Sequence, residues 1–291
     1  MSGMDWYPAP AKLNLFLHVL GRRSDGYHLL QTVFRLVDLC DEVGVAVRDD
    51  GVIRRVDATP GVEEKDDLCL RAARILREHA LTSGIPGAQV LGVDLGLRKR
   101  IPIGGGLGGG SSDAATVLRV LNVRWGLNLG QHELMALGLR LGADVPVFVL
   151  GRNALGEGVG ERLSPLVLDP AWYLILFPQV SVSTKEIFSS PALTRDTKPL
   201  KIPPFLPGLG HNDLQKVAVG LYPVIAAHLE WLLQCDKVRL ARMTGSGACV
   251  FAEFESERDA RAAAARLPGQ MRGAVVRGLE RHPLEDAPGS S

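Results

Sequence analysis

The stretch IPIGGGLGGGSSDAATVLRVLN, residues 101–122, places six glycines in seven positions, from Gly104 to Gly110, directly before helix-forming residues. Glycines let backbone N–H groups approach an anion closely, and the N-terminus of a helix favours negative charge. Ser111 and Ser112 are suited to cap the helix that follows. The stretch therefore predicts a loop that binds phosphate groups.

Two familiar glycine patterns fit this loop only in part. Gly104, Gly106 and Gly109 satisfy G-x-G-x-x-G, but RKRIP separates the loop from the preceding strand pattern, and no acidic residue follows about 20 residues on. Gly105 and Gly110 match the Walker pattern, whose lysine is absent. A flexible linker or a packing turn is the structural alternative. If the loop holds a transferring phosphoryl group, Mg²⁺ and a cation from elsewhere must neutralise that group.

A lysine stands on the first predicted strand, upstream of the loop. Residues 9–19, APAKLNLFLHV, alternate in type, so that the aliphatic side chains face one way while Lys12 and Asn14 face the other. At the rise of a strand these two side chains stand about 7 Å apart. A polar site and a solvated strand face both account for this pattern.

The rest of the chain predicts mixed helix and strand structure in two parts. Strand patterns at 29–39 and 43–48 follow the first strand without a helix between them, which favours an α+β fold. The proline-rich residues 189–211 predict a long surface loop, and glycines and charges at 151–165 indicate the domain change. The other predicted elements are helices capped by Asp66 or Asp67 and by Ser111 or Ser112, helices at 131–142, 212–234 and 256–266, and strands at 88–97, 172–177 and within 238–254.

The composition argues against several classes of protein. The 291 residues include 33 Lys and Arg against 32 Asp and Glu, so no net field attracts nucleic acid or an anionic membrane. The N-terminus has no basic and apolar leader pattern, and the apolar run WYLILF is too short to span a bilayer. Scattered cysteines and the lack of any H-x-x-x-H pair argue against zinc sites. We expect a cytoplasmic protein whose partner is a small molecule, with no nucleic acid and no membrane.

Three segments together resemble the GHMP kinases, a family of small-molecule kinases. They are PAPAKLNLFLHV at 8–19, PIGGGLGGGSSDAA at 102–115 and MTGSGACVF at 243–251, and they keep the family's order. The resemblance implies ATP as phosphoryl donor, Mg²⁺, and an active site in a cleft between two domains. It also implies a ribosomal S5 domain 2-like N-terminal domain, predicted over residues 1–162, and a ferredoxin-like C-terminal domain over residues 163–291.

Further segments resemble one branch of that family. Residues 11–34, 141–148 and 156–161 are similar to the kinases that phosphorylate the 2-hydroxyl of a methylerythritol linked to cytidine diphosphate, on a route to isoprenoids. The resemblance therefore implies a cytidine-linked small-molecule substrate. We expect a monomer or a weak homodimer.

Two residues match the family's catalytic pair. Asp144 matches the catalytic aspartate, and its place two residues before Pro146 puts it on a constrained loop. Its implied role is general base for the substrate hydroxyl. Lys12 matches the active-site lysine, which would hold Asp144 ionised and stabilise charge during transfer. Asn14 is carried over as a substrate contact; a helix-end aspartate, a solvated lysine and a strand-edge amide are the structural alternatives.

The base-binding residues come from two segments. Tyr27 and His28 match the family's cytidine-binding pair, since an aromatic ring stacks on a base and histidine offers donor and acceptor groups. Phe188 would cover the other face of the base, and Thr184 would form a hydrogen bond nearby. Ordinary packing under the proline-rich loop is the alternative for Phe188.

The resemblance also distributes roles over the two glycine-rich motifs. Lys99 would help to bind ATP, unless it is a solvated member of RKR, and Ser112 would ligate Mg²⁺. Gly245, Ser246 and Gly247 would shape the active site, a tight structural turn being the alternative. Asp67 stands where the family usually has asparagine and is left out of the site. The residues expected to wrap the ATP phosphates are Pro102, Ile103, Gly104, Gly105, Gly106, Leu107, Gly108, Gly109, Gly110, Ser111 and Ser112.

Two rival functions remain at this point. The first is another GHMP kinase, acting on mevalonate, homoserine or a sugar, none of which carries a base for Tyr27, His28 and Phe188 to bind. The second is a nucleotide-binding module without catalysis, which would have no need of both Lys12 and Asp144.

Overall fold

Two long paired strands are the central element of the fold. The computed structural model describes residues 3–57, 63–202 and 208–286. Within it, β1 (Asp5–Arg22) and β2 (His28–Arg48) pair antiparallel from end to end. The two strand patterns predicted at 29–39 and 43–48 are thus one strand. A shift of register between Pro10 and Ala11 accommodates extra residues of β2 at this point, so the pairing continues through the interruption in the sequence pattern.

The first sheet grows from the other edge of β2. This edge pairs antiparallel with β4 (Gly92–Arg98) at one end and with β5 (Ala154–Gly158) at the other. The short β3 (Ile53–Arg55) adds to β4 in parallel, and β6 (Arg162–Pro165) adds to β5. The strand expected at 88–97 is confirmed as β4, which begins after a single 3₁₀ turn, η2 (Ala88–Val90).

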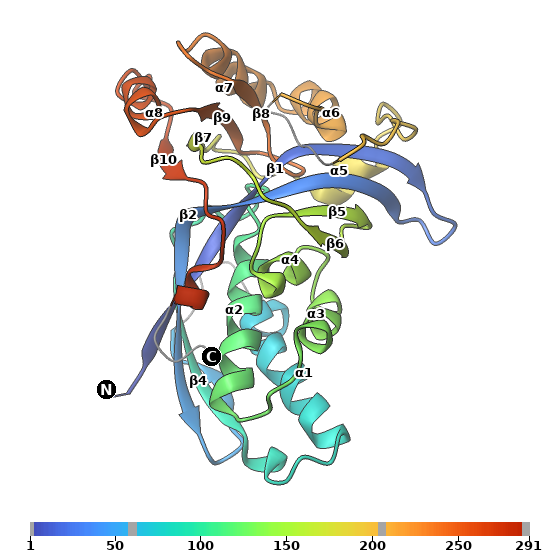
Figure 1. Cartoon of the computed structure of the whole chain (residues 1–291), viewed down its shortest axis with the longest axis vertical. Helices are drawn as coiled ribbons and strands as arrows, with labels where there is room; N and C mark the ends of the chain where they lie inside the picture. The colour runs from blue at the N-terminus through green and yellow to red at the C-terminus, as the bar shows by residue number, and fades with distance from the viewer. Residues whose placement is uncertain (1–2, 58–62, 203–207, 287–291) are drawn as a thin grey trace.

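Four helices pack on one face of this sheet (Figure 1). Asp67 caps the first of them, as predicted, by accepting hydrogen bonds from the N–H groups of Cys69 and Leu70. The predicted serine cap of the second is wrong. Its N-cap is Gly108 at a φ of 73°, so Ser111 and Ser112 lie inside the first turn. These helices are α1 (Leu68–Thr82), which follows η1 (Glu64–Asp66), α2 (Gly109–Arg124), α3 (Gln131–Leu139) and α4 (Val145–Leu150).

The second sheet has four antiparallel strands in the order β10-β7-β9-β8. Three helices connect β7 to β8 and one connects β9 to β10, and this connectivity with the strand order is the ferredoxin-like topology that the resemblance implied. The helix expected at 212–234 is two helices, because Tyr222 ends the first and Pro223 starts the second. The elements are β7 (Trp172–Leu176), α5 (Thr184–Ser189), α6 (Asp213–Leu221), α7 (Pro223–Leu233), β8 (Leu240–Met243), β9 (Val250–Phe254), α8 (Glu257–Ala264) and β10 (Gly273–Arg277).

Three apolar cores join these layers into one body. The first lies between the first sheet and α1–α4, and the second lies between the second sheet and its helices. The third core lies between β1, β2 and the second sheet, where Leu13 and Leu15 pack with Tyr173 and Phe251. β1 also sends Leu17 into the second core. The hairpin of β1 and β2 therefore belongs to both halves.

The end of the chain returns to the first half. After β10, Gly278 forms a β-bridge with Val37, and η3 (Pro283–Asp286) places Leu284 in the first core. The α+β class and the two-part architecture are confirmed, while the boundary between 162 and 163 remains a prediction. Part of the predicted loop at 189–211, residues 203–207, lies outside the described residues. None of the helices in the described ranges has both the length and the apolar character needed to cross a membrane.

Candidate active site

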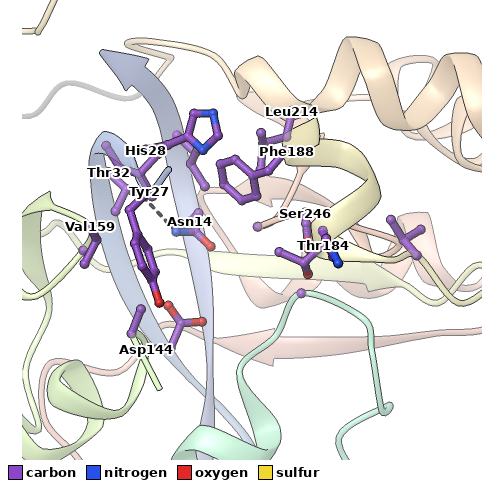
Figure 2. Close-up of a pocket in the computed structure, with 18 of the residues that line it drawn as sticks. Asn14, Tyr27, His28, Thr32, Asp144, Val159, Thr184, Phe188, Leu214 and Ser246 are labelled. Carbon is purple, nitrogen blue, oxygen red and sulfur yellow. Dashed lines mark hydrogen bonds between the residues drawn. The ribbon is translucent and has the colours of Figure 1, made fainter. Parts of the chain in front are cut away.

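A cavity of about 580 Å³ opens between the two halves of the protein. Strand β1 supplies Lys12 and Asn14, the segment before α4 supplies Asp144, and the second half supplies Phe188 and Ser246. Figure 2 shows the side chains of Asn14, Asp144, Phe188 and Ser246 converging from opposite walls. The structure therefore brings the predicted catalytic and substrate-binding residues into one cavity.

Lys12 makes several polar contacts in this cavity. Its side chain is almost fully buried, and its Nζ lies 3.2 Å from Oδ2 of Asp144. The ammonium donates hydrogen bonds to Oδ1 of Asn14 at 2.6 Å and to the carbonyl oxygen of Gly106 at 3.0 Å. The backbone N–H of Lys12 donates to the carbonyl oxygen of Leu107. Lys12 thus joins β1, the glycine loop and Asp144.

Asp144 is held by its backbone while its carboxylate stays available. It is the N-cap residue of α4, with Pro146 in the first turn, but its side chain makes no capping hydrogen bond. The side chain is 36% exposed and faces the cavity. A carboxylate beside an ammonium group and open to a ligand can accept a proton from a hydroxyl placed there.

Hydrogen bonds fix both the side chain and the backbone of Asn14. Its Nδ2 donates to Oγ1 of Thr32 at 2.9 Å, and that hydroxyl donates to the carbonyl oxygen of Phe16. Its backbone N–H donates to Oγ1 of Thr244 at 2.9 Å. Sequence reasoning missed both threonines, although Thr32 also lines the cavity. Thr244 immediately precedes the third glycine motif, and that adjacency is the signal that could have found it.

The other end of the cavity is aromatic. The rings of His28 and Phe188 lie 4.9 Å apart between centroids at an angle of 33°. Tyr27 is 65% exposed at the rim, and the hydroxyls of Thr184 and Ser246 share a hydrogen bond of 2.7 Å. All five predicted residues line the cavity. Phe188 lies beside His28, and both rings border the space that Tyr27 overlooks (Figure 2).

A second cavity, of about 340 Å³, lies on the far side of the glycine loop. The loop from Pro102 to Ser111 lines it, together with Lys99. Gly104, Gly106 and Ser111 line both cavities, so the loop separates the two spaces and borders each of them. Sequence reasoning missed most of the other wall, which consists of Arg55, Asp66, Asp67, Leu68, Cys69, Leu97 and Asp113.

Ser112 is placed differently from the expectation, whereas Lys99 lines the second cavity but has partners that the sequence did not indicate. Ser112 is fully buried and lines neither cavity, whereas Ser111 lines both, because the helix starts at Gly109 and its turn rotates Ser112 inward. The ammonium of Lys99 pairs with the buried carboxylates of Asp41 and Asp113. Burial raises the pKa of Asp113. Lys99 therefore borders the second cavity while it is bound to two carboxylates of its own chain.

The third motif, Gly245 to Gly247, packs against the glycine loop. Gly245 and Ser246 line the first cavity, while Gly247 lies outside its wall at a φ of 92°. Gly106 is in the left-handed region, and a Cβ there would overlap the carbonyl oxygen of Thr244. The two motifs approach so closely that this position requires glycine.

The described residues contain no cluster of three or more His, Cys, Asp or Glu side chains arranged to hold a metal ion. The Ser111 hydroxyl and the Asp144 carboxylate are two oxygen groups that line the first cavity, which Gly104 and Gly106 of the loop also line. Such a sparse set suits Mg²⁺, which commonly takes one or two protein oxygens and completes its shell with phosphate oxygens and water.

Comparison with known proteins agrees with this architecture. The model of the GHMP kinases N terminal domain matches residues 67–152, and that of the GHMP kinases C terminal domain matches residues 205–273. A solved structure of 4-(cytidine 5'-diphospho)-2C-methyl-D-erythritol kinase is 35% identical with a TM-score of 0.79, covering 94% of this chain and 99% of its own. A homoserine kinase from Cytophaga hutchinsonii, 16% identical with a TM-score of 0.64 over 97% of this chain and 96% of its own, shares the fold.

Curated relatives are closer in sequence. The 4-diphosphocytidyl-2-C-methyl-D-erythritol kinase of Nitrosospira multiformis is 58% identical over 96% of this chain and 92% of its own length. The enzyme of the same name from Thiobacillus denitrificans is also 58% identical, over 96% of this chain and 97% of its own. The chain therefore belongs to the GHMP kinase family and, within it, to the 4-diphosphocytidyl-2-C-methyl-D-erythritol kinases.

Proposed function

We propose that the chain transfers the γ-phosphoryl group of ATP to the 2-hydroxyl of 4-diphosphocytidyl-2-C-methyl-D-erythritol, giving the 2-phosphate and ADP for isoprenoid precursor biosynthesis. The observation that carries this proposal is the ion pair between Lys12 and Asp144. It lies in a cavity with an aromatic end, and a glycine loop divides that cavity from a second one. A base-linked alcohol and a nucleoside triphosphate would meet there.

The reaction needs a proton acceptor and stabilisation of phosphoryl charge. The 2-hydroxyl oxygen forms a bond to the γ-phosphorus while the bond to the β,γ-bridging oxygen breaks, and ADP leaves. Asp144 accepts the hydroxyl proton. Lys12 stabilises the charge that develops on the phosphoryl oxygens, together with N–H groups of the loop from Gly104 to Gly110. Asn14 orients the substrate chain, because its own position is fixed by hydrogen bonds to Lys12 and Thr32.

ATP would occupy the second cavity with its phosphates along the glycine loop. The dipole of α2, whose first residue is Gly109, supports negative charge at this point. Mg²⁺ would be held by the Ser111 hydroxyl and the Asp144 carboxylate, and when bound it neutralises phosphate charge. The carboxylates of Asp41 and Asp113 neutralise the charge of Lys99, so Lys99 contributes little positive field near the phosphates.

The cytosine ring would bind at the aromatic end. Tyr27 and Phe188 offer faces for stacking, and His28 offers a ring nitrogen to the base edge. Thr184 and Ser246 would contact the diphosphate or the sugar through the hydroxyls that they now pair with each other. The protein is expected to act in the cytoplasm, as a monomer or a weak homodimer, without nucleic acid.

One coupled assay of ADP release tests the substrate. Purified protein with Mg·ATP is given the cytidylyl substrate or, in separate reactions, mevalonate, homoserine or galactose. Turnover with the cytidylyl substrate alone supports the proposal. Turnover only with mevalonate, homoserine or galactose would assign the chain to another branch of the family, and turnover with none would favour a binding module.

A further inference from the structure

Arg195 lies behind the aromatic end of the first cavity and contacts both of its walls. We propose that Arg195 is a positioning residue for base recognition: it holds His28 as the neutral tautomer that carries its proton on Nδ1. This inference rests on the proposed function for the identity of the base. Arg195 follows α5 in the segment that leads away from Phe188 and is not among the residues that line the cavity.

The hydrogen bonds of Arg195 fix its guanidinium group. Its Nε donates to Nε2 of His28 at 3.1 Å. Its Nη1 donates to the carbonyl oxygen of Leu193 at 3.0 Å, and its Nη2 donates to those of Phe188 at 2.9 Å and Ser190 at 2.8 Å. The guanidinium group thus makes four hydrogen bonds, three to backbone carbonyl oxygens and one to a ring nitrogen. Because the group is planar, these bonds hold it in one orientation.

The chemistry of the two groups then decides the tautomer. A guanidinium group only donates hydrogen bonds and stays protonated in proteins. Nε2 of His28 must therefore offer its lone pair, and a neutral imidazole in that state carries its proton on Nδ1. Among the described side chains, no hydrogen-bond partner occupies Nδ1, and His28 lines the cavity. Nδ1–H is thus a donor available to a base, and it suits the acceptor atoms N3 and O2 of cytosine.

Electrostatics keep the ring neutral. Burial lowers the pKa of His28, and the cations Arg195 and Arg22 lower it further. Arg195 comes from the segment after α5, and Arg22 comes from the end of β1, so positive charge acts on His28 from two separate segments. The nearby Asp25 carboxylate is paired with Arg23. A protonated ring would lose the Arg195 hydrogen bond and face a cation instead.

Arg195 also ties the two aromatic walls together. Its guanidinium connects His28, the first residue of β2, to the carbonyl oxygen of Phe188 near the end of α5. The two rings stand 4.9 Å apart (Figure 2). A change of this side chain should therefore disturb recognition of the base while leaving the phosphoryl site, which lies around Lys12, in place.

Kinetics of Arg195→Met, Arg195→Lys and a matched control provide the first test. Arg261→Met is the control, because Arg261 is an exposed residue of α8 that pairs with Glu257. We expect Arg195→Met to raise KM for the cytidylyl substrate roughly ten- to hundredfold, which is the range for a hydrogen bond that involves a charged group. KM for ATP and kcat at saturating substrate should change less than about threefold. Arg195→Lys should show a smaller rise, since it keeps the charge but not the fork.

The pH dependence of KM separates a positioning role from a general loss of structure. Without the Arg195 cation the pKa of His28 rises, so the increase of KM on acidification should begin at a higher pH in Arg195→Met than in the wild type. An unchanged pH profile together with an unchanged KM would overturn the proposal. So would an equal loss of kcat and of ATP binding.

A spectroscopic test needs neither turnover nor a substitution of Arg195. In wild-type protein with ¹⁵N-labelled histidine, the His28 signals, assigned by their loss in His28→Gln, should show protonated Nδ1 and unprotonated Nε2 at pH 7. A proton on Nε2, or an imidazolium, would refute the inference about Arg195. Failure of the wild type to phosphorylate the cytidylyl substrate would instead refute the proposed function and leave this result standing.

Discussion

Replacement of Lys12 by methionine should remove most of the turnover and little of the ATP affinity. The ammonium group of Lys12 contacts three separate groups: Asp144, Asn14 and the carbonyl oxygen of Gly106. Methionine keeps nearly the same length and volume without the charge. The fold around it should survive, because backbone bonds such as the one from the N–H of Lys12 to Leu107 remain.

The size of the effect follows from the geometry. Two unit charges 3.2 Å apart interact by about 5 kcal/mol at an effective dielectric constant of about 20. The Asp144 side chain is 36% exposed, so solvent screens part of this attraction. Loss of one preorganised donor at a reaction centre typically costs about 3 kcal/mol, and a loss of this size is expected for Lys12→Met. It corresponds to a decrease of kcat of roughly a hundredfold.

The coupled assay of ADP release, at saturating Mg·ATP and cytidylyl substrate, measures kcat. A separate titration measures ATP binding, which should change less than about fivefold, because Lys12 lines only the first cavity. Lys237→Met is the matched control, since Lys237 is an exposed residue that pairs with Asp259. A Lys12→Met variant with a normal melting temperature and a kcat within about threefold of the wild type would refute the role given to Lys12.

Three more predictions concern other parts of the chain. Asp144→Asn should lower kcat at least a hundredfold in the same assay, since an amide cannot accept the proton, and normal turnover would contradict its role as a base. Gly106→Ala should lower the free energy of unfolding by about 2 kcal/mol in urea titrations, because it strains a positive φ and overlaps the carbonyl of Thr244, whereas Gly220→Ala, where a Cβ meets nothing within 4 Å, should not. Burial holds the pKa of His282 well below its usual 6.5, and its Nδ1 accepts a hydrogen bond from the N–H of Leu284. Its contribution to stability is therefore complete above pH 6.5 and declines as the unfolded chain takes up a proton below it. Wild type should lose about 1 kcal/mol more than His282→Gln between pH 7.5 and 5.5, and equal losses would contradict this account.

The sequence predicted correctly those features that depend on residues close together in the chain. The alternation around Lys12 and Asn14 correctly placed both side chains on one face, and the Asp67 cap follows from rules that act over three or four residues. Asp144 was found through the resemblance, because nothing in its own surroundings separates it from an ordinary helix-end aspartate. The structure adds what no local rule contains, namely that its carboxylate meets Lys12, a residue far away in the chain.

What could not be predicted depends on contacts between distant segments or on the phase of a helix. Whether Ser111 or Ser112 faces the cavities depends on the residue at which α2 begins, and a glycine-rich stretch leaves that start undefined. The partnership of Lys99 with Asp41 and Asp113 requires three segments to meet, and the contact of Arg195 with His28 requires the proline-rich stretch to fold back on β2. None of these pairs has a sequence spacing that any periodicity could reveal.

The hairpin of β1 and β2 carries candidate site residues at two places. Lys12 pairs with Leu36 in the middle of the ladder, and Arg22 pairs with His28 at the end next to the turn. The distance between the proposed phosphoryl site and the proposed base site therefore depends on the number of strand residues between them, and under the proposed function the hairpin sets the length of a substrate that reaches both. Tilting one half of the protein against the other would not change this interval. Lengthening each strand by two residues would keep every side chain on its face and move the base site outward by about 7 Å.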